Sequence, residues 1–408
     1  MRVVILSQYF APEPIPKPLE LAESLMARGH DVAVVTGFPN YPSGKLYDGH
    51  RLRLWKRERA GQVPVLRTFE YPYHGLRVLG RGANYLSFAA SAMLALAMVK
   101  RPDVLYVWHP PLTIGLPAWL LSRLWRAPFV LDVQDIWPDT AIHVGALQPG
   151  AVTSALHVLE RFVYRRAAHV ITTTSAAREN LLEKGVPPAK VTALPHWIDP
   201  GEWRAPMHER DAARDALGWR DRFVTLHAGN IGLLQALESV VAAAGELDRR
   251  FLLVIVGDGS ERARLESLAA TRGLTDRVQF LPRRPPSDMP RLYAAADALL
   301  VHLKRSMFAL WSVPTKTLAY LSSGRPLIVA TEGPSIDLVE RARAGLVAPP
   351  ESPEALARTI RALAAYPESE RLAMGERGRA FVSAHLSRDQ VVPQYEALLR
   401  AAIVNSRQ

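Results

Sequence analysis

Short apolar runs alternate with helical patterns along the first half of the chain. The apolar runs lie at residues 3–6, 32–36, 103–108, 129–133 and 170–174. The helical patterns lie at residues 19–28, 113–126 and 151–166. Continuous apolar strands separated by helices are typical of a parallel sheet that is covered on both faces. The first half therefore predicts an α/β, doubly wound domain.

The same alternation starts again in the second half. Strand patterns lie at residues 223–227, 251–256, 278–281, 298–303 and 327–330, and helical patterns at 236–246, 260–272, 353–366 and 390–403. Residues 194–200, between the two series, are rich in proline and turn-forming residues, as expected of a domain boundary. Doubly wound sheets bind ligands beyond the carboxyl ends of their strands, where helix N-termini favour phosphorylated groups.

Composition narrows the possible chemistry. The chain has 408 residues, of which 49% are apolar, and a formal net charge of +11. It contains no cysteine, which excludes disulfides, a thiolate nucleophile, cysteine-ligated zinc and iron–sulfur clusters. No cationic segment leads into a long apolar run, and no run of about 20 apolar residues occurs, so we expect neither a signal peptide nor a membrane-spanning helix.

Basic charge is concentrated in one region of the chain. Residues 51–100 hold nine basic and two acidic side chains, beside an apolar stretch at residues 85–99. One interpretation is a surface, made by residues 51–101, that contacts an anionic membrane. The other is a buried core helix flanked by a solvated basic loop, because an apolar stretch of this length also describes a core helix.

Glycines follow one apolar strand of the second half. The strand at 251–256 runs into Gly257, Asp258 and Gly259 and then into a helical pattern. Glycine at such a position allows a tight turn and a close approach of the backbone to a ligand. The same residues also form ordinary turns, so both interpretations remain open.

A second segment could hold an anion at the start of a helix. Ser312 is placed as a helix cap and Pro314 as a first-turn residue. The N–H groups of Thr315 and Lys316 could then bind a diphosphate, and the alternative is an ordinary capped helix with exposed cations. Three cations are candidates for additional positive charge: Lys304, Lys316 and Arg325.

Two residues of the first half directly follow strands. His109 comes after the strand at 103–108, and Asp135 follows the strand at 129–133. Both positions suit contact with a ligand, and the alternatives are a structural histidine and an N-capping aspartate. The chain has no His-Glu-x-x-His, no G-x-x-x-x-G-K-[ST], no G-x-S-x-G and no Asp-x-Asp motif. We therefore predict no metal site, and stabilisation of a diphosphate by cations and helix N-termini.

Several motifs together resemble those of a known family. Residues 253–303 carry Val-Gly-Asp-Gly at 256–259, Asp-Arg-Val-Gln-Phe-Leu at 276–281 and Leu-Tyr-Ala-Ala-Ala-Asp at 292–297. They resemble the second domain of retaining glycosyltransferases of family 4, which have the GT-B fold. Other segments are similar to the WbuB-like branch of cell-surface polysaccharide transferases: 9–13, 28–32, 36–44, 135–139 and 227–232.

This resemblance implies a fold and an activity. The expected architecture is two Rossmann-like doubly wound domains facing across a cleft, an acceptor domain at 1–198 and a donor domain at 199–385. The helix at 386–408 is expected to pack back on the first domain. The expected reaction moves a sugar, with retention, from a nucleotide-diphosphate sugar, in the first place a UDP-sugar, without a further cofactor or a metal.

The resemblance and the basic, apolar region at 51–101 together imply partners and a location. The acceptor is expected to be a sugar linked to polyprenyl diphosphate, in exopolysaccharide, O-antigen or capsule assembly. A cytoplasmic protein that is peripheral on the inner face of the plasma membrane would meet such an acceptor.

This resemblance, together with the positions of the residues described above, suggests residue roles. His109 would lie by the transferred sugar, Asp135 would orient the acceptor or His109, and Lys304 would face the leaving diphosphate. Pro14, Ile15, Pro16 and Lys17 occupy the place of a glycine-rich loop near the donor. The expected donor-binding set is Gly229, Asn230, Gly257, Asp258, Gly259, Arg283, Ser312, Pro314, Thr315, Lys316 and Arg325.

The chain departs from the family pattern at a few positions. Trp311 and Ala319 occupy the places of two glutamates near the diphosphate, and Asn230 and Gln235 those of an arginine and a lysine. Two alternatives therefore stand beside the transferase: a catalytically degenerate GT-B-like binding subunit, and a sugar-nucleotide epimerase of the same fold. We do not expect a nucleic-acid binder, because the basic residues lack a recognisable reading module.

Overall fold

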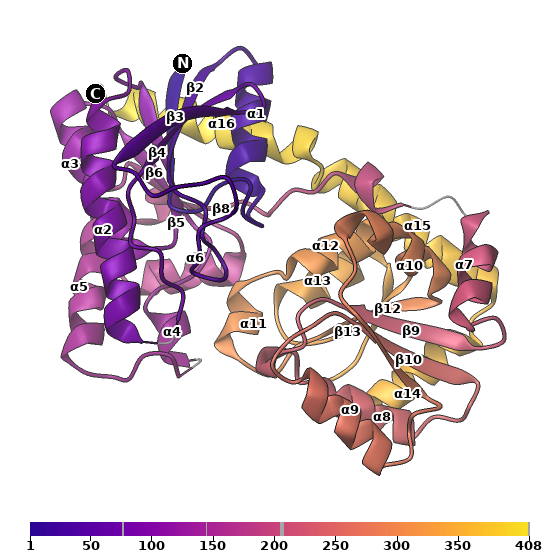
Figure 1. Ribbon diagram of the computed structural model, residues 1–408. Coiled ribbons are helices and arrows are strands. Elements are labelled where there is room, and N and C mark those ends of the chain that lie inside the picture. The colour runs from indigo at the N-terminus through magenta and orange to yellow at the C-terminus, as the bar shows by residue number, and fades with distance from the viewer. Residues whose placement is uncertain (76, 144, 205–207, 407–408) are drawn as a thin grey trace. The chain divides into compact units, whose positions relative to one another are not determined.

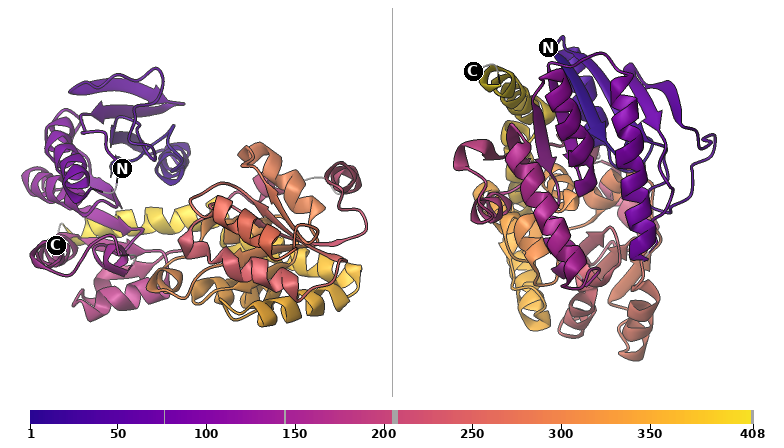
Figure 2. Two further views of the ribbon diagram at one scale, coloured as in Figure 1. Left: turned by 60° about the horizontal axis from the view of Figure 1, so that its bottom comes forward. Right: turned by 90° about the vertical axis from the view of Figure 1, so that its left-hand side faces the viewer.

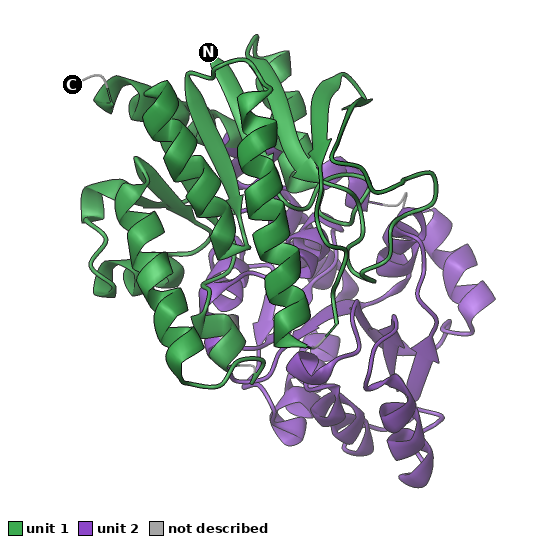
Figure 3. Cartoon of the chain, turned by 60° about the vertical axis from the view of Figure 1, so that its left-hand side comes forward, with its two compact units in different colours: residues 1–195, 392–408 green, residues 196–391 purple. Residues whose placement is uncertain are grey.

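The computed structural model describes residues 1–75, 77–143, 145–204 and 208–406. The chain folds into two compact units, drawn in different colours in Figure 3. Unit 1 is Met1–Pro195 with Val392–Gln408, and unit 2 is His196–Val391. Each unit is built around its own sheet, and the two are described separately below.

The sheet of unit 1 has eight strands in the order β3-β4-β2-β1-β5-β6-β7-β8. All neighbours are parallel except β3 and β4. The strands are β1 (Arg2–Ser7), β2 (Asp31–Gly37), β3 (Trp55–Ala60), β4 (Val63–Thr68), β5 (Val104–His109), β6 (Phe129–Val133), β7 (His169–Thr172) and β8 (Val191–Ala193). The five apolar runs of the first half overlap β1, β2, β5, β6 and β7, which confirms the α/β prediction.

The basic region contains a hairpin that the apolar pattern did not predict. Strand β3 pairs antiparallel with β4 at the edge of the sheet, and its residues alternate between exposed and half-buried. Charged side chains are common on edge strands because they prevent further strand pairing. Part of the expected basic loop is therefore an edge strand.

Helices cover the sheet of unit 1. Helices α2, α3 and α5 contact one another in sequence and form one layer, visible in the right-hand view of Figure 2. The helices are α1 (Lys17–Ala27), α2 (Val78–Ala97), α3 (Gly115–Trp125), α4 (Asp139–His143), α5 (Ala151–Arg166) and α6 (Ser175–Glu183), with short 3-10 turns η1 (Leu112–Ile114) and η2 (Pro188–Lys190). No described helix is long and apolar enough to cross a membrane.

The last helix of the chain, α16 (Arg388–Asn405), ends in unit 1. Glu396 accepts hydrogen bonds from Arg28 and, over 2.9 Å, from His30 Nε2. The buried ring of Tyr395 packs edge-on against Tyr106 of β5. Residues far apart in the sequence therefore share one core.

The sheet of unit 2 has six parallel strands in the order β11-β10-β9-β12-β13-β14. They are β9 (Phe223–Ala228), β10 (Phe251–Val256), β11 (Val278–Leu281), β12 (Ala298–His302), β13 (Leu327–Ala330) and β14 (Gly345–Val347). Alternate residues of β10 enter two separate cores, Leu252 and Val254 on one face and Leu253 and Ile255 on the other. This explains why the strand is apolar throughout.

Helices lie on both faces of this sheet, as Figure 1 shows. One core includes residues of α8, α9 and α14, and the other includes residues of α10, α12, α13 and α15. The helices are α7 (Glu209–Leu217), α8 (Leu237–Gly245), α9 (Arg262–Thr271), α10 (Met289–Ala295), α11 (Met307–Trp311), α12 (Thr315–Ser322), α13 (Pro334–Ala342), α14 (Pro353–Ala365) and α15 (Glu368–His385). Three 3-10 turns complete the unit: η3 (Pro200–Trp203), η4 (Leu233–Gln235) and η5 (Pro286–Asp288).

Candidate functional site

Loops that follow three neighbouring strands meet at the carboxyl edge of unit 2. Gly229 and Asn230 follow β9, Gly257 to Gly259 follow β10, and Lys304 follows β12. The first two loops are joined by a hydrogen bond from the backbone N–H of Ile231 to the carbonyl of Asp258, at 2.8 Å. This edge is where ligands of doubly wound sheets bind.

Gly257 is required by the contact between these loops. Its φ of +146° is a conformation that L side chains rarely adopt, and a Cβ atom would lie 1.9 Å from the carbonyl oxygen of Gly229. The exposed amide of Asn230 lies close to Gly232 of its own loop and to Gly259 of the loop after β10. The structure therefore brings together five of the expected donor residues: Gly229, Asn230, Gly257, Asp258 and Gly259.

Helix α12 begins at the same edge. Its N-cap is Pro314, which has no side-chain oxygen, so the expectation that Ser312 caps this helix is wrong. The N–H of Thr317 donates to the carbonyl of Pro314 at 2.9 Å. The N–H groups of Thr315 and Lys316 come before that of Thr317, in the first turn of the helix. There no helix carbonyl is placed to accept from them. The uncapped helix start can therefore bind an anion.

Lys316 brings a cation to this helix start. A Cβ atom on Gly229 would lie 3.0 Å from the Lys316 Nζ, which places the ammonium beside the β9 loop. The Nζ lies 3.2 Å from the Nε2 of His227, the penultimate residue of β9. Burial lowers the pKa of Lys316 to about 7. His227 was not among the expected site residues, although it belongs to the segment 227–232.

Two other expected cations lie at this edge but apart from Lys316. Lys304 is exposed, and its backbone N–H donates to the carbonyl of Leu234 at 2.8 Å. It lines a pocket of about 360 Å³ that also includes Glu261 and Glu351. Arg283 is exposed and follows β11.

Arg325 lies at the opposite edge of the sheet from Lys316. It precedes β13, whereas Lys316 is in the first turn of α12 at the carboxyl edge. Its guanidinium is buried, and burial lowers its pKa to about 10, with Arg210 lowering it further and Asp297 opposing the shift. The structure therefore does not bring Arg325 together with the other expected diphosphate ligands.

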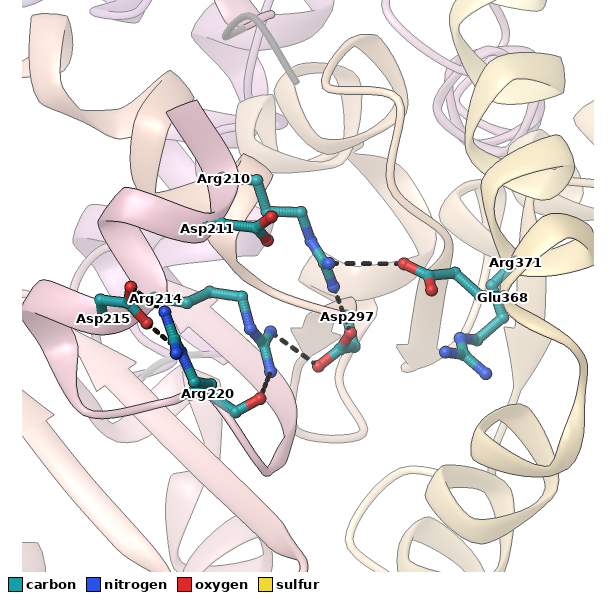
Figure 4. Close-up of a pocket in the computed structure, with 8 residues that line it drawn as sticks. All are labelled: Arg210, Asp211, Arg214, Asp215, Arg220, Asp297, Glu368 and Arg371. Carbon is teal, nitrogen blue, oxygen red and sulfur yellow. Dashed lines mark hydrogen bonds and ion pairs between the residues drawn. The ribbon is translucent and has the colours of Figure 1, made fainter. Parts of the chain in front are cut away.

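A pocket at this opposite edge, shown in Figure 4, is lined by charged side chains, several of which pair with one another. Asp297, just before β12, accepts hydrogen bonds from Arg210 at 2.7 Å and from Arg214 at 3.0 Å. Arg210 also pairs with Glu368 at 3.3 Å. Because Arg214 also donates to carbonyls of the chain, including that of Ala295, this network fastens α7 to the sheet.

In unit 1, His109 and Asp135 lie at the carboxyl edge of neighbouring strands. The N–H of Gln134 donates to the carbonyl of His109 at 3.0 Å. His109 is fully buried, and among the described residues neither of its ring nitrogens has a hydrogen-bond partner. Burial, assisted by the charge of Lys184, lowers its pKa to about 3, so the ring is neutral near pH 7.

Asp135 is engaged by its own loop. Burial raises the pKa of its carboxyl, and hydrogen bonds from Thr140, Ile136 and Trp137 oppose the shift. These bonds tie the carboxyl of Asp135 to the segment that leads into α4, whose first residue is Asp139.

The sequence reasoning missed a buried polar cluster at the same edge. Gln8, Asn40 and Glu70 follow β1, β2 and β4 and are all fully buried. The carboxylate of Glu70 accepts from Gln8 Nε2 at 2.6 Å and from Asn40 Nδ2 at 2.7 Å. Asn84 of α2 donates to the same Glu70 oxygen as Gln8, at 3.5 Å. Isolated polar residues carry no periodic signal, so only the fold shows that they meet.

Aromatic rings lie beside this cluster. The ring centroids of Tyr9 and Tyr41 are 5.1 Å apart, and His74 lies 5.6 Å from Tyr9 and 5.1 Å from Tyr41. Burial raises the pKa of Tyr9 well above its usual value, and it lowers the pKa of His74 to about 4. The side chains of Tyr9 and His74 are therefore uncharged near pH 7.

The segment 14–17 leads into α1. The helix begins at Lys17 with Pro16 as its N-cap, and Lys17 Nζ pairs with Glu20 at 3.0 Å. The N–H of Ile15 donates to the carbonyl of Glu13 at 2.7 Å. Since Pro14 and Pro16 have no N–H, this segment has few free donors for a phosphate. No group of three or more potential metal ligands occurs in the described part of the chain.

The two halves of the chain match two family models in succession. Residues 17–197 match the glycosyl transferase 4-like domain, and residues 209–381 match the glycosyl transferases group 1. A curated relative, the putative colanic acid biosynthesis glycosyl transferase WcaI of Escherichia coli K12, is 30% identical over 390 residues, covering 92% of this chain and 93% of its own. The probable glycosyltransferase WbjE of Pseudomonas aeruginosa is 25% identical over 318 residues, covering 74% and 78%.

Solved structures share the fold of the whole chain. Anabaena HepE in complex with UDP has a TM-score of 0.76 and 18% identity, covering 98% of this chain and 100% of that one. WaaG, a glycosyltransferase involved in lipopolysaccharide biosynthesis, has a TM-score of 0.65 and 18% identity, covering 99% of each chain. At these identities the likeness concerns the fold alone.

Proposed function

This chain belongs to the family 4 type of glycosyltransferases with the GT-B fold, and from that premise we propose that it moves a sugar from a nucleotide-diphosphate sugar to a lipid-linked acceptor. The donor would bind to unit 2 and the acceptor to unit 1. The observation that carries the proposal is the anion site of unit 2. There the uncapped start of α12, the ammonium of Lys316 and the turn at Gly257 lie at one edge of the sheet.

These groups suit a diphosphate that gains charge during the reaction. The proposed step breaks the bond between the anomeric carbon and the β-phosphate oxygen. An acceptor hydroxyl oxygen bonds to that carbon on the same face, and its proton passes to the departing phosphate. Fixed N–H donors and cations lower such a barrier, and a single fixed donor is worth about 3 kcal/mol. Thr315 and Lys316 are the principal ligands in this proposal, with Lys304 and Arg283 further along the same edge.

His109 is the proposed contact for the transferred sugar. Its ring is buried, neutral and without a hydrogen-bond partner in the described residues, so a sugar hydroxyl could satisfy it. Asp135 then acts by fixing the loop that follows β6. The proposed donor nucleotide is UDP, supported by the likeness to HepE, which was solved with UDP and with UDP-glucose.

The proposed acceptor is carried by a membrane lipid. Helix α2 presents Leu79, Leu86 and Leu94 to solvent, with 89%, 59% and 74% of their surface exposed. The opposite face of the helix packs in the core through residues such as Phe88. An exposed apolar helix face in a strongly basic region suits the surface of an anionic bilayer. The relatives' names further support a role in assembling a cell-surface polysaccharide.

The test is transfer by the purified protein. UDP-sugars carrying a labelled sugar are incubated with the protein and a lipid extract that contains polyprenyl-diphosphate sugars. We expect label in the lipid phase and an equal amount of released UDP. Donor binding is measured separately by thermal shift, where a ligand at 100 times its dissociation constant stabilises by about 2.7 kcal/mol. If none of a panel of nucleotide sugars stabilises the protein, the proposal is wrong.

A binding subunit is the second candidate, because both expected glutamate positions are occupied by buried apolar residues. Trp311 is 7% exposed, and Ala319, at 3%, belongs to the core of unit 2. A subunit of this kind would bind a nucleotide sugar and release no nucleotide with any acceptor. Stoichiometric release of UDP excludes it.

A further inference from the structure

His227 and Lys316 form a pair whose geometry fixes the role of each nitrogen. His227 lies on β9 and is 1% exposed. Its Nδ1 lies 3.1 Å from the carbonyl oxygen of Leu300 on the neighbouring strand β12. Because a carbonyl oxygen only accepts, Nδ1 carries the proton, and the Nε2 of the neutral ring is left as an acceptor.

That acceptor faces the amine of Lys316. The Nε2 lies 3.2 Å from the Nζ of Lys316, which donates to it. Gly229 completes the arrangement, because a Cβ atom there would lie 3.0 Å from the Nζ and 3.3 Å from the Cε. The lysine stem therefore runs from α12 toward β9 across the place of the missing side chain.

The groups around the pair keep the imidazole neutral. Burial, followed by the charge of Lys316 and then that of His302, lowers the pKa of His227 well below 6.5. His302 of β12 is itself held neutral, with its Nδ1 bonded to the carbonyl of Gln235 at 2.7 Å. The hydroxyl of Tyr320, on α12, bonds instead to the backbone of Ala228 at 2.7 and 3.1 Å. No acidic side chain in the described residues bonds to the Lys316 amine.

We propose that His227 is the positioning residue of the donor site, holding the amine of Lys316 where a nucleotide diphosphate would meet the first turn of α12. The inference rests on the proposed function, since it assigns Lys316 to the diphosphate. A neutral acceptor suits this task better than a carboxylate. It orients the amine without adding a negative charge that would repel the diphosphate.

The physical gain is preorganisation. A lysine side chain has several rotatable bonds, and fixing it on binding costs about 0.5–1.5 kcal/mol. If His227 holds the amine in place before the ligand binds, the lysine side chain is already ordered in the folded protein. Its ordering then no longer reduces the free energy of binding. Removal of the acceptor should therefore weaken the donor complex by roughly threefold to tenfold.

The experiment is a double-mutant cycle read by calorimetric titration with UDP. We expect Lys316→Gln to weaken binding by at least about tenfold, because hydrogen bonds to charged groups are strong. His227→Phe should weaken it by roughly threefold to tenfold. The double variant should bind no more weakly than Lys316→Gln alone, because His227 acts only through the amine.

Two further variants separate positioning from general damage to the sheet. His227→Gln keeps an acceptor near the place of Nε2 and should restore most of the affinity. Thr225→Val lies two residues earlier on the same face of β9, is equally buried and removes a hydroxyl without a partner. It should leave affinity unchanged. If His227→Phe does not fold, His227→Met replaces it, because methionine fits irregular spaces and carries no nitrogen.

The outcomes distinguish this inference from the proposed function. If Lys316→Gln weakens binding but the His227 variants do not, the positioning role is overturned and the donor site stands. Additive losses in the double variant likewise overturn it, because His227 would then act independently of the amine. If the unmodified protein binds UDP no better than Lys316→Gln does, the assignment of Lys316 and the inference fail together.

Discussion

Burial and charge oppose each other at Lys316. Burial lowers the pKa of its amine to about 7, whereas a bound diphosphate would favour the charged form and raise that pKa. Donor binding should therefore take up a proton above pH 7. The affinity should be greatest below pH 7 and should fall as the pH rises above it, at most about tenfold per pH unit.

Titration calorimetry with a UDP-sugar between pH 6 and pH 9 measures this dependence, and buffers of different ionisation enthalpy count the protons. A UDP-sugar is preferred to UDP because its diphosphate has no group that titrates near pH 7. The Lys316→Gln variant should lose the slope and serves as the control. A flat profile in the unmodified protein would contradict a diphosphate contact at this amine.

His109 has no described hydrogen-bond partner of its own, which predicts a role in turnover. His109→Ala should lower turnover by at least about tenfold, the lower range for loss of a positioned catalytic group. His169→Ala is the matched control, because His169 begins β7 at the opposite edge of the same sheet and bonds to Thr192. Near-normal turnover by a folded His109→Ala enzyme would remove His109 from the mechanism.

For single residues, the sequence predicted the place in a strand, loop or helix better than the residues that each one contacts. The loop glycines and Lys316 were found because they follow strands or begin a helix, and these features appear in the order of the residues. Arg325 was expected with them because it lies nine residues further along the chain. The eight-residue helix α12 begins at one edge of the sheet and ends at the other. Arg325 therefore lies far from Lys316 although the two residues are close in the sequence.

At the scale of elements, the buried strands were the most predictable. Strands β6, β10, β11 and β13 have the predicted bounds. In β10 and β13 every residue is apolar and buried, whereas β6 and β11 each contain one polar residue in an otherwise apolar run. Strand β3 was missed because its charged residues give no apolar run. Strands β8 and β14, of three residues each, are too short for a periodic signal.

Helix α2 is the element whose exposed face carries a prediction of its own. Flotation with vesicles tests it, comparing phosphatidylglycerol-containing with neutral phosphatidylcholine vesicles. The protein should float with the anionic vesicles, because apolar contact and basic charge act together there. The double variant Leu86→Glu with Leu94→Glu should remain in solution.

Val404→Glu is the control for this experiment, because Val404 is a comparably exposed apolar residue (56%) on α16, outside the basic region. It should float like the unmodified protein. Charge reversal at Arg53, Lys56 and Arg57 should reduce flotation with anionic vesicles only. Equal partitioning of every variant would count against the membrane surface.

At the scale of the whole molecule, the repeat of the strand and helix pattern predicted two α/β units of similar size. Both sheets are found, parallel except for one edge strand in unit 1. The closure of unit 1 by α16 depends on Glu396 meeting Arg28 and His30, across more than 360 positions of sequence. The local pattern of apolar and polar residues cannot predict contacts over such a separation. The expectation that the C-terminal helix packs on the first domain came from the family resemblance instead.

The central claim is that unit 2 holds the diphosphate of a nucleotide sugar with backbone N–H groups and a lysine. A crystal structure of the protein with a bound UDP-sugar tests it most directly. We predict phosphate oxygens within hydrogen-bond distance of the N–H groups of Thr315 and Lys316 and of the Lys316 amine. Phosphates bound elsewhere, for example among the arginines around Asp297 at the opposite edge of the sheet, would contradict it.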